Sequence, residues 1–123
     1  MNNNVKKDVK FLTKKIKKRM SDARRRSEKK KWIFNLDFDY LRDLFVEQGA
    51  KCFYTGLPFD LSCDLGTMSL DRYDNDIGYL KGNVVWCRSG VNILKYKRSY
   101  EKTLFICQKI LLHRPKFKIM KDK

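Results

Sequence analysis

A strand–loop–strand–helix pattern in the second half of the chain constrains its fold more than any other feature. Residues 68–71 and 83–87 have the composition of short strands, and residues 74–78 between them are polar. Gly78 is expected to supply a backbone conformation with positive φ in that loop. Ser89 is a suitable N-cap for a helix that follows the second strand. We therefore predict a β-hairpin followed by a helix, in a domain of the α+β class.

Helices are predicted on both sides of this unit. Apolar residues at spacings of three or four predict a long N-terminal helix, and they are Val5, Val9, Leu12, Ile16 and Met20. Asp37 is a suitable N-cap for a helix over residues 38–48, which Gly49 would end. A last helix is predicted over residues 100–112, where apolar side chains recur at helical spacing.

Charge is the second constraint on this chain of 123 residues. It carries 29 Lys and Arg against 14 Asp and Glu, a net charge of +15. Such an excess favours polyanions through counterion release, so nucleic acid is the expected partner, although ribosomal and membrane-surface proteins are also basic. We divide the chain into a basic helical N-terminal arm (1–33), a central domain (34–112) and a basic C-terminal tail (113–123). The arm is either a solvated helix packed on the domain or a phosphate-contacting element, and its run of like charges favours the second.

The sequence predicts an intracellular protein. No apolar run reaches the roughly 18–20 residues that a membrane-spanning helix needs. The N-terminus also lacks a signal-peptide pattern, so we expect the cytoplasm of a bacterium or of an infected host cell. In that reducing compartment the cysteines should be free and mostly buried. They are Cys52, Cys63, Cys87 and Cys107.

Three oxygen-bearing side chains stand in the strand–loop–strand–helix unit, at Asp71, Asn83 and Asn92. The predicted fold would direct them toward one point. Carboxylate and amide oxygens suit a hard divalent cation such as Mg²⁺ or Mn²⁺. A metal held by so few protein ligands keeps positions open for water and phosphate, which is an arrangement that serves phosphodiester cleavage.

About two thirds of the chain, from Arg24 to Gln108, resembles the small HNH-type (ββα-metal) endonucleases of phages and mobile elements. The matching sequence motifs are KCFYTGLPF at 51–59, SLDRYDN at 69–75, GY at 78–79 with GNV at 82–84, and VN at 91–92 with Lys95. The resemblance implies a ββα-metal core, similar to a treble clef, with a β-hairpin and flanking helices. It also implies a metal-dependent endonuclease or nickase that cleaves phosphodiester bonds in DNA.

The resemblance assigns roles to individual residues. Asp71 and Asn92 would hold a single Mg²⁺ or Mn²⁺, and Asn83 would tie the loop to the core through side-chain to backbone hydrogen bonds. Arg72 stands where the family has its water-activating histidine, and an arginine remains protonated and accepts no proton. In the phage-type branch Arg is frequent here, and it would contact the phosphate and stabilise the transition state. Water activation would fall to a metal-bound hydroxide or to a carboxylate such as Asp74.

Each of these residues also has a plainer interpretation. The alternative for Asp71 is a turn carboxylate that accepts backbone hydrogen bonds, and the alternative for Asn92 is a solvent-facing residue of its helix. Arg72 would serve equally as a DNA-backbone contact or as one partner of a structural ion pair. Without the histidine, the same scaffold would suit a module that binds nucleic acid and does not cut it.

Phosphate contacts are predicted for basic side chains of the arm, for Arg72 beside the first strand, and for three basic residues of the chain that follows the hairpin. They are Lys14, Lys18, Arg24, Arg25, Arg26, Arg72, Lys95, Lys97 and Arg98. Double-stranded DNA is the expected partner. Because phosphate contacts carry no sequence information, we expect either weak sequence specificity or specificity supplied by a protein partner. Many HNH enzymes hold a structural zinc on paired Cys-x-x-Cys motifs, but Cys52 and Cys87 lack the second cysteine, so we expect none. Trp86 is expected in the core, and Tyr79 is expected to brace the loop.

Overall fold

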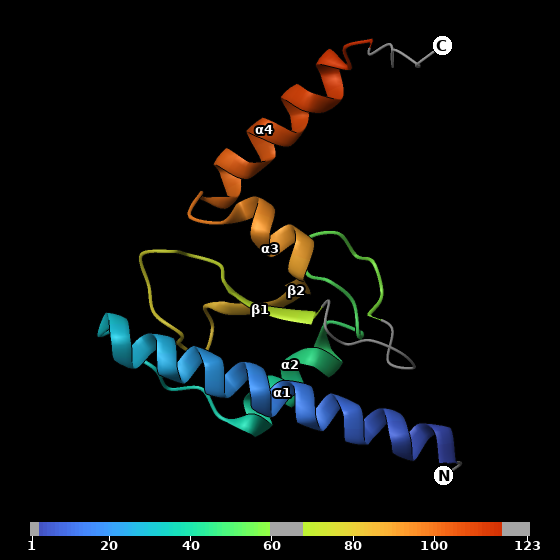
Figure 1. Cartoon of the computed structure of the whole chain (residues 1–123), viewed down its shortest axis with the longest axis vertical. Helices are drawn as coiled ribbons and strands as arrows, with labels where there is room; N and C mark the ends of the chain where they lie inside the picture. Colours follow the sequence, from blue (N-terminus) through green and yellow to red (C-terminus); the bar gives the residue numbers. More distant parts are fainter. Residues whose placement is uncertain (1–2, 60–67, 117–123) are drawn as a thin grey trace, which may run out of the picture.

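The computed structural model describes residues 3–59 and 68–116, except for the side chains of Asn4 and Val5. Within these residues the chain forms four helices and one two-stranded antiparallel sheet, so the predicted α+β class is confirmed. In chain order the elements are α1 (Asn3–Lys30), α2 (Phe38–Glu47), β1 (Met68–Arg72), β2 (Val84–Arg88), α3 (Ser89–Lys95) and α4 (Tyr100–His113) (Figure 1). The predicted strands and helices exist, with ends that shift by one or two residues. Most of the predicted C-terminal tail lies outside the described residues.

The hairpin lies between helices on both of its faces. In Figure 1, α1 and α2 lie on one side of β1 and β2, and α3 lies on the other. Strands that are covered on both faces bury their side chains in runs, and four successive residues of β2 are buried. Trp86, opposite Leu70 in the register, is fully buried, and its indole N–H donates to the carbonyl of Leu41 at 2.9 Å. The prediction of Trp86 as a core residue is confirmed.

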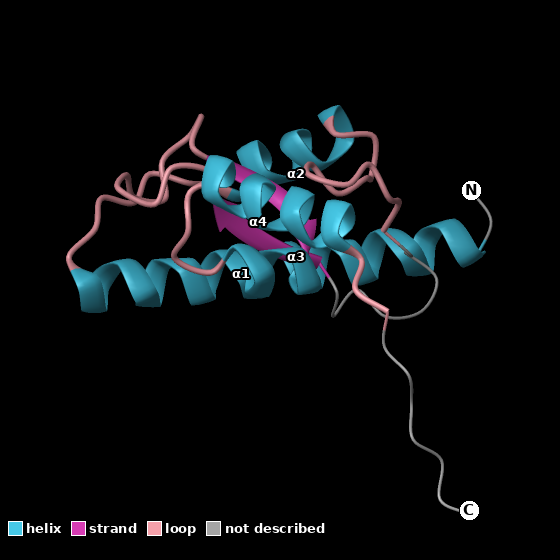
Figure 2. Cartoon of the chain, turned by 90° about the horizontal axis from the view of Figure 1, so that it is seen from above, coloured by secondary structure: helices cyan, strands magenta, loops and turns pink. Residues whose placement is uncertain are grey.

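Helix α1 belongs to the core of the domain. Ile16, Ala23 and Ser27 are buried against the rest of the fold, and Leu12 and Met20 are packed beside them. The predicted apolar stripe is therefore confirmed in its middle. Val9 is exposed instead, and the side chain of Val5 lies outside the described residues. Helix α1 extends past both ends of the hairpin (Figure 2). Most of its basic side chains are exposed to solvent.

Helix α2 has the ends that its sequence predicts. The carboxylate of Asp37 accepts a hydrogen bond from the backbone N–H of Tyr40 at 2.8 Å, which satisfies one free donor of the first turn. At the other end, Gly49 has φ +69° and its N–H donates to the carbonyl of Val46. The N–H of Ala50 donates to the carbonyl of Phe45. Together with the bond from Gly49, this hydrogen bond forms a Schellman motif.

Gly78 has a different purpose from the one predicted. It is not among the residues with positive φ. Instead, a Cβ atom at this position would lie 2.3 Å from the carbonyl oxygen of Ile33, so only a glycine leaves room for that backbone. The close approach lets Phe34 pair with Tyr79 in a short parallel bridge. The segment before α2 is thereby fastened to the loop of the hairpin.

The cysteines of the described residues are free thiols, and Cys52 and Cys87 are buried as predicted, whereas Cys107 is half-buried. Cys63 lies outside the described residues. Burial raises the pKa of the Cys87 thiol. No helix in the described part of the chain combines the length and the apolar character needed to cross a bilayer.

Candidate functional site

A cavity of about 400 Å³ opens between the C-terminal end of α1, the hairpin and α3. Asp71 and Arg72, at the end of β1, line this cavity, and Asn92 lines it from α3. The fold therefore brings together the two predicted metal ligands and the arginine beside them. We refer to this space as the Asp71 cavity.

Asp71 is a buried carboxylate, with 6% of its surface exposed. Its Oδ2 atom accepts a hydrogen bond of 2.5 Å from the hydroxyl of Tyr54 and lies 3.3 Å from the ammonium of Lys95. The Oδ1 atom takes part in neither contact. Asp71 is therefore held through one oxygen; it lies in β1 and contacts side chains, unlike the turn carboxylate of the plainer interpretation, which would accept backbone hydrogen bonds.

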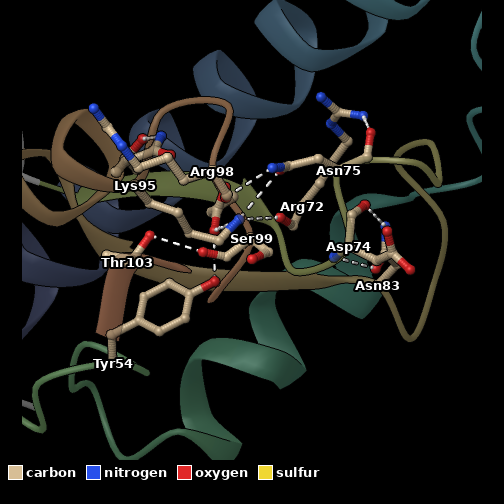
Figure 3. Close-up of polar contacts among 12 residues, drawn as sticks. Tyr54, Arg72, Asp74, Asn75, Asn83, Lys95, Arg98, Ser99 and Thr103 are labelled. Carbon is tan, nitrogen blue, oxygen red and sulfur yellow. Dashed lines mark hydrogen bonds and ion pairs between the residues drawn. The ribbon is translucent and has the colours of Figure 1, made fainter. Parts of the chain in front are cut away.

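The structure contradicts the prediction that Lys95 contacts phosphate. This lysine is 1% exposed, and its ammonium points into the protein. Besides Asp71, it contacts the carbonyl of Arg72 at 3.1 Å and the amide oxygen of Asn75 at 3.2 Å (Figure 3). An ammonium has three N–H donors, and here three acceptors surround it. Lys95 thus ties α3 to β1 and to the loop that follows β1.

Tyr54 completes this buried cluster from the segment before β1. Burial raises the pKa of its phenol, and the neighbouring Asp71 carboxylate raises it further. The hydroxyl therefore keeps its proton and acts as a hydrogen-bond donor to Asp71. Asp71, Lys95 and Tyr54 form a neutral unit in which each charge faces a partner.

Arg72 is fixed in place by an aromatic ring and by the loop. Its guanidinium carbon lies 3.7 Å from the ring centroid of Trp32, and Nη1 donates to the carbonyls of Asn75 and Ile77 at 2.7 and 3.1 Å. Among the described residues no carboxylate pairs with Arg72, so the ion-pair interpretation has no support there. A guanidinium held in this way is preorganised to meet an anion in the Asp71 cavity.

Asn83 makes the loop-tying hydrogen bonds that were expected of it. Its side-chain oxygen accepts from the N–H of Asp74 at 2.9 Å. Its side-chain nitrogen donates to the carbonyls of Asp74, Ile77 and Gly78. Asn83 does not line the Asp71 cavity, so its position supports a structural role and no direct part in chemistry.

Asp74 does not line the Asp71 cavity. It lines a neighbouring cavity of about 310 Å³ with Tyr73, Asp76 and Glu101, and its carboxylate accepts from the N–H of Asp76 at 2.9 Å. The possibility that Asp74 activates water at the Asp71 cavity is therefore not supported by its location.

Asn92 is oriented by a hydrogen bond from its side-chain nitrogen to the hydroxyl of Ser69 at 2.8 Å. This bond uses the amide N–H group and leaves the amide oxygen as the ligand atom. Asp71 and Asn92 together thus offer hard oxygens of the type that Mg²⁺ and Mn²⁺ prefer. Within the described residues no three His, Cys, Asp or Glu side chains cluster to form a complete metal cage. The pair fits an ion that retains water and takes substrate oxygens as further ligands, with an affinity reduced by the nearby Lys95 charge.

Only part of the predicted phosphate-binding set borders the Asp71 cavity. Arg26, Arg72 and Lys97 line it, and Lys30, which was not predicted, lines it as well. Its spacing could have predicted this position, because Lys30 lies one helical turn after Arg26 and therefore on the same face of α1. Trp32 and Tyr96 also line the cavity without having been singled out.

The remaining predicted contacts do not line it. The group comprises Lys14, Lys18, Arg24, Arg25, Lys95 and Arg98. Some have other partners: Arg24 lies over the ring of Phe34, and Arg25 pairs with Asp22 at 3.1 Å. The surface of α1 is basic on several sides, but its side chains at the cavity are fewer than predicted.

A comparison with known proteins finds similarity to a phage protein. The chain is 32% identical over 90 residues to a protein of Enterobacteria phage T4 described as an uncharacterized 29.0 kDa protein in the dda-modA intergenic region. The match covers 73% of this chain and 36% of the phage protein, so the chain spans about a third of that relative's length. No protein-family model matches the chain, and no solved structure matches it significantly.

Proposed function

We propose that this chain is a metal-dependent endonuclease of the HNH type that nicks DNA. The observation that carries the proposal is the meeting of Asp71, Arg72 and Asn92 at one cavity. Hairpin and α3 follow each other in the order that a ββα-metal core requires. Basic side chains of α1 and of the segment after α3 border the same cavity, where a phosphate backbone would be attracted.

Each side chain has a defined task in this proposal. Asp71 and Asn92 would hold one Mg²⁺ or Mn²⁺, which would supply Lewis-acid polarisation of the phosphate and would lower the pKa of bound water. Lys95 and Tyr54 hold Asp71 in position. Arg72, fixed on Trp32, would bind a phosphate oxygen and stabilise the negative charge that develops during cleavage. Arg72 does not accept the proton of the attacking water, because a guanidinium stays protonated.

A plasmid-nicking assay with Mg²⁺ or Mn²⁺ tests this proposal. Asn92→Ala removes a ligand oxygen and should lower the nicking rate by about a hundredfold or more, a loss typical of removing one essential group. Asn92→Asp keeps an oxygen at the same position and should retain much of the rate. Asp76→Asn, in the loop outside the Asp71 cavity, is the matched control and should cut like the wild type. Unchanged nicking by both Asp71→Ala and Asn92→Ala would refute the site.

A second candidate function is a module that binds nucleic acid without cutting it. Two observations favour it: the ammonium of Lys95 already neutralises Asp71, and Arg72 stands in the position of the expected histidine. This function predicts DNA binding that weakens steeply with salt and no nicking with any divalent metal. Metal-dependent nicking that Asn92→Ala abolishes would exclude it.

A further inference from the structure

Tyr96, which follows the last residue of α3, has a backbone conformation that normally requires glycine. Its φ and ψ are 47° and −119°, and the N–H of Arg98 donates to the carbonyl of Lys95 at 2.8 Å. These features describe a β-turn whose first central residue has the angles of type II′, where glycine dominates. A tyrosine in this conformation is strained, and such strain is concentrated at functional sites.

Packing inside the protein does not explain why a tyrosine stands there. Its side chain is 66% exposed, and among the described residues no other aromatic ring stacks on it. The ring lines the Asp71 cavity, and so does Ile93, one turn earlier on α3 and 75% exposed. The rim of a basic cavity thus presents an aromatic and an aliphatic side chain to solvent.

Charged groups lie beside this apolar rim. The ammonium of Lys97 lies 5.5 Å from the ring centroid of Tyr96 and lines the same cavity, as do Arg26 and Lys30 across from it on α1. A ligand that matches the surface therefore needs an anionic part for the cations and a flat apolar part for the ring. A nucleotide within a strand has both, because its phosphate is anionic and its base has a π face.

We propose that Tyr96 is a stacking platform for an unpaired nucleobase of a DNA strand whose phosphate enters the Asp71 cavity. The inference rests on the proposed function in that it places DNA in the same cavity. It specifies the substrate class, which is DNA with an unpaired base beside the bound phosphate, either single-stranded or bulged. A base within a perfect duplex is stacked between its neighbours and has no free face for the ring.

DNA affinity measured in EDTA tests the proposal, because cleavage then plays no part. Fluorescence anisotropy with a labelled single-stranded oligonucleotide should show Tyr96→Gly binding roughly tenfold more weakly than the wild type, and Tyr96→Phe binding within about twofold. The wild type should bind an oligonucleotide of abasic sites as weakly as Tyr96→Gly binds the intact strand. On a perfect duplex, wild type and Tyr96→Gly should bind alike.

Thermal unfolding of the same variants separates a binding role from a structural one. Tyr96→Gly should raise the melting temperature, because glycine adopts the turn without strain. If the tyrosine side chain only supported the fold, replacing it by glycine would lower both the melting temperature and the affinity for DNA. Opposite changes in melting temperature and affinity therefore identify a residue kept for its ligand.

Lys97→Met is the matched control at the neighbouring position. It should reduce the dependence of affinity on salt by about one phosphate contact, whereas Tyr96→Gly should leave that dependence unchanged. Equal binding of single-stranded DNA by wild type and Tyr96→Gly would overturn the proposal, and so would an equal loss on a perfect duplex. If these results hold and the wild type cuts neither plasmid nor the single-stranded oligonucleotide with Mg²⁺ or Mn²⁺, the endonuclease proposal fails and the base-stacking site stands.

Discussion

Two walls of the Asp71 cavity differ in how their polar groups are satisfied. The hairpin wall is Asp71 together with Lys95 and Tyr54, which are packed behind it and do not themselves line the cavity, and each charged or hydroxyl group of the three has a partner inside the protein. On the α3 rim, Ile93 and Tyr96 face solvent, and Tyr96 has a strained backbone. The hairpin wall is organised to hold a carboxylate in one position, whereas the α3 rim exposes apolar side-chain surface that a ligand can contact.

The buried ion pair on the hairpin wall is better explained by positioning than by stability. Removing two charges from water costs several kcal/mol per ion, and their attraction repays this only with good geometry and additional hydrogen bonds. Here the additional bonds are present, from Lys95 to Arg72 and Asn75 and from Tyr54 to Asp71. The pair therefore fixes the carboxylate relative to α3 and the loop, at little net gain in folding free energy.

The largest effect is expected when one partner of the Asp71–Lys95 ion pair is removed and the other is left in place. Lys95→Met leaves Asp71 charged and buried without its cation, so the free energy of unfolding should fall by about 3–5 kcal/mol. Urea denaturation followed by circular dichroism measures this change. Lys97→Met removes an exposed lysine from the α3 rim and should change stability by less than about 0.5 kcal/mol.

A double variant sharpens the test. Lys95→Met with Asp71→Leu replaces both charges by apolar groups and should be more stable than Lys95→Met alone. If Lys95→Met were as mild as Lys97→Met, the claim that the two walls differ in electrostatic organisation would be wrong.

Two glycines near these walls give the next largest effect. Gly78→Ala places a Cβ atom 2.3 Å from the carbonyl oxygen of Ile33, and the resulting clash should destabilise the fold by about 1–3 kcal/mol. Gly90→Ala, in α3, meets no atom within 4 Å and should stabilise the protein by up to about 1 kcal/mol, because alanine favours a helix. Melting temperatures of the two variants should shift in opposite directions. A melting temperature that does not fall in Gly78→Ala would show that the loop yields where the structure shows close contact.

Local patterns in the sequence predicted much of the frame of this site. The Asp37 cap, the end of α2 at Gly49 and the hairpin depend on neighbouring residues, so their signals are visible in short windows. The convergence of Asp71 and Asn92 followed from the order of strand, loop, strand and helix.

The interior of the site was not predictable in the same way. Lysine is almost never fully buried, so residue type favoured an exposed Lys95, and its burial depends on acceptors that lie 20 or more positions earlier. The strain of Tyr96 is likewise set by how the turn after α3 closes, and no glycine marks the turn in the sequence. Both features arise from tertiary contacts that a short window does not contain.

The smallest expected effect concerns the tyrosine of the hairpin wall, and it carries a pH signature. Tyr54→Phe removes one hydrogen bond to Asp71 while Lys95 stays in place, so stability at pH 8 should fall by about 1 kcal/mol. The folded state raises the pKa of Tyr54 above its unfolded value of about 10, mainly through burial.

The stabilisation from this tyrosine is therefore fully present below pH 10 and is lost as the pH rises further, because only the unfolded chain then ionises. The difference in unfolding free energy between wild type and Tyr54→Phe should shrink between pH 8 and pH 11, as measured by urea denaturation at both values. The other tyrosines are common to both proteins and cancel in the comparison. A constant difference would mean that the phenol of Tyr54 is as accessible to water as the side chains of the α3 rim, and the contrast between the two walls would not extend to this residue.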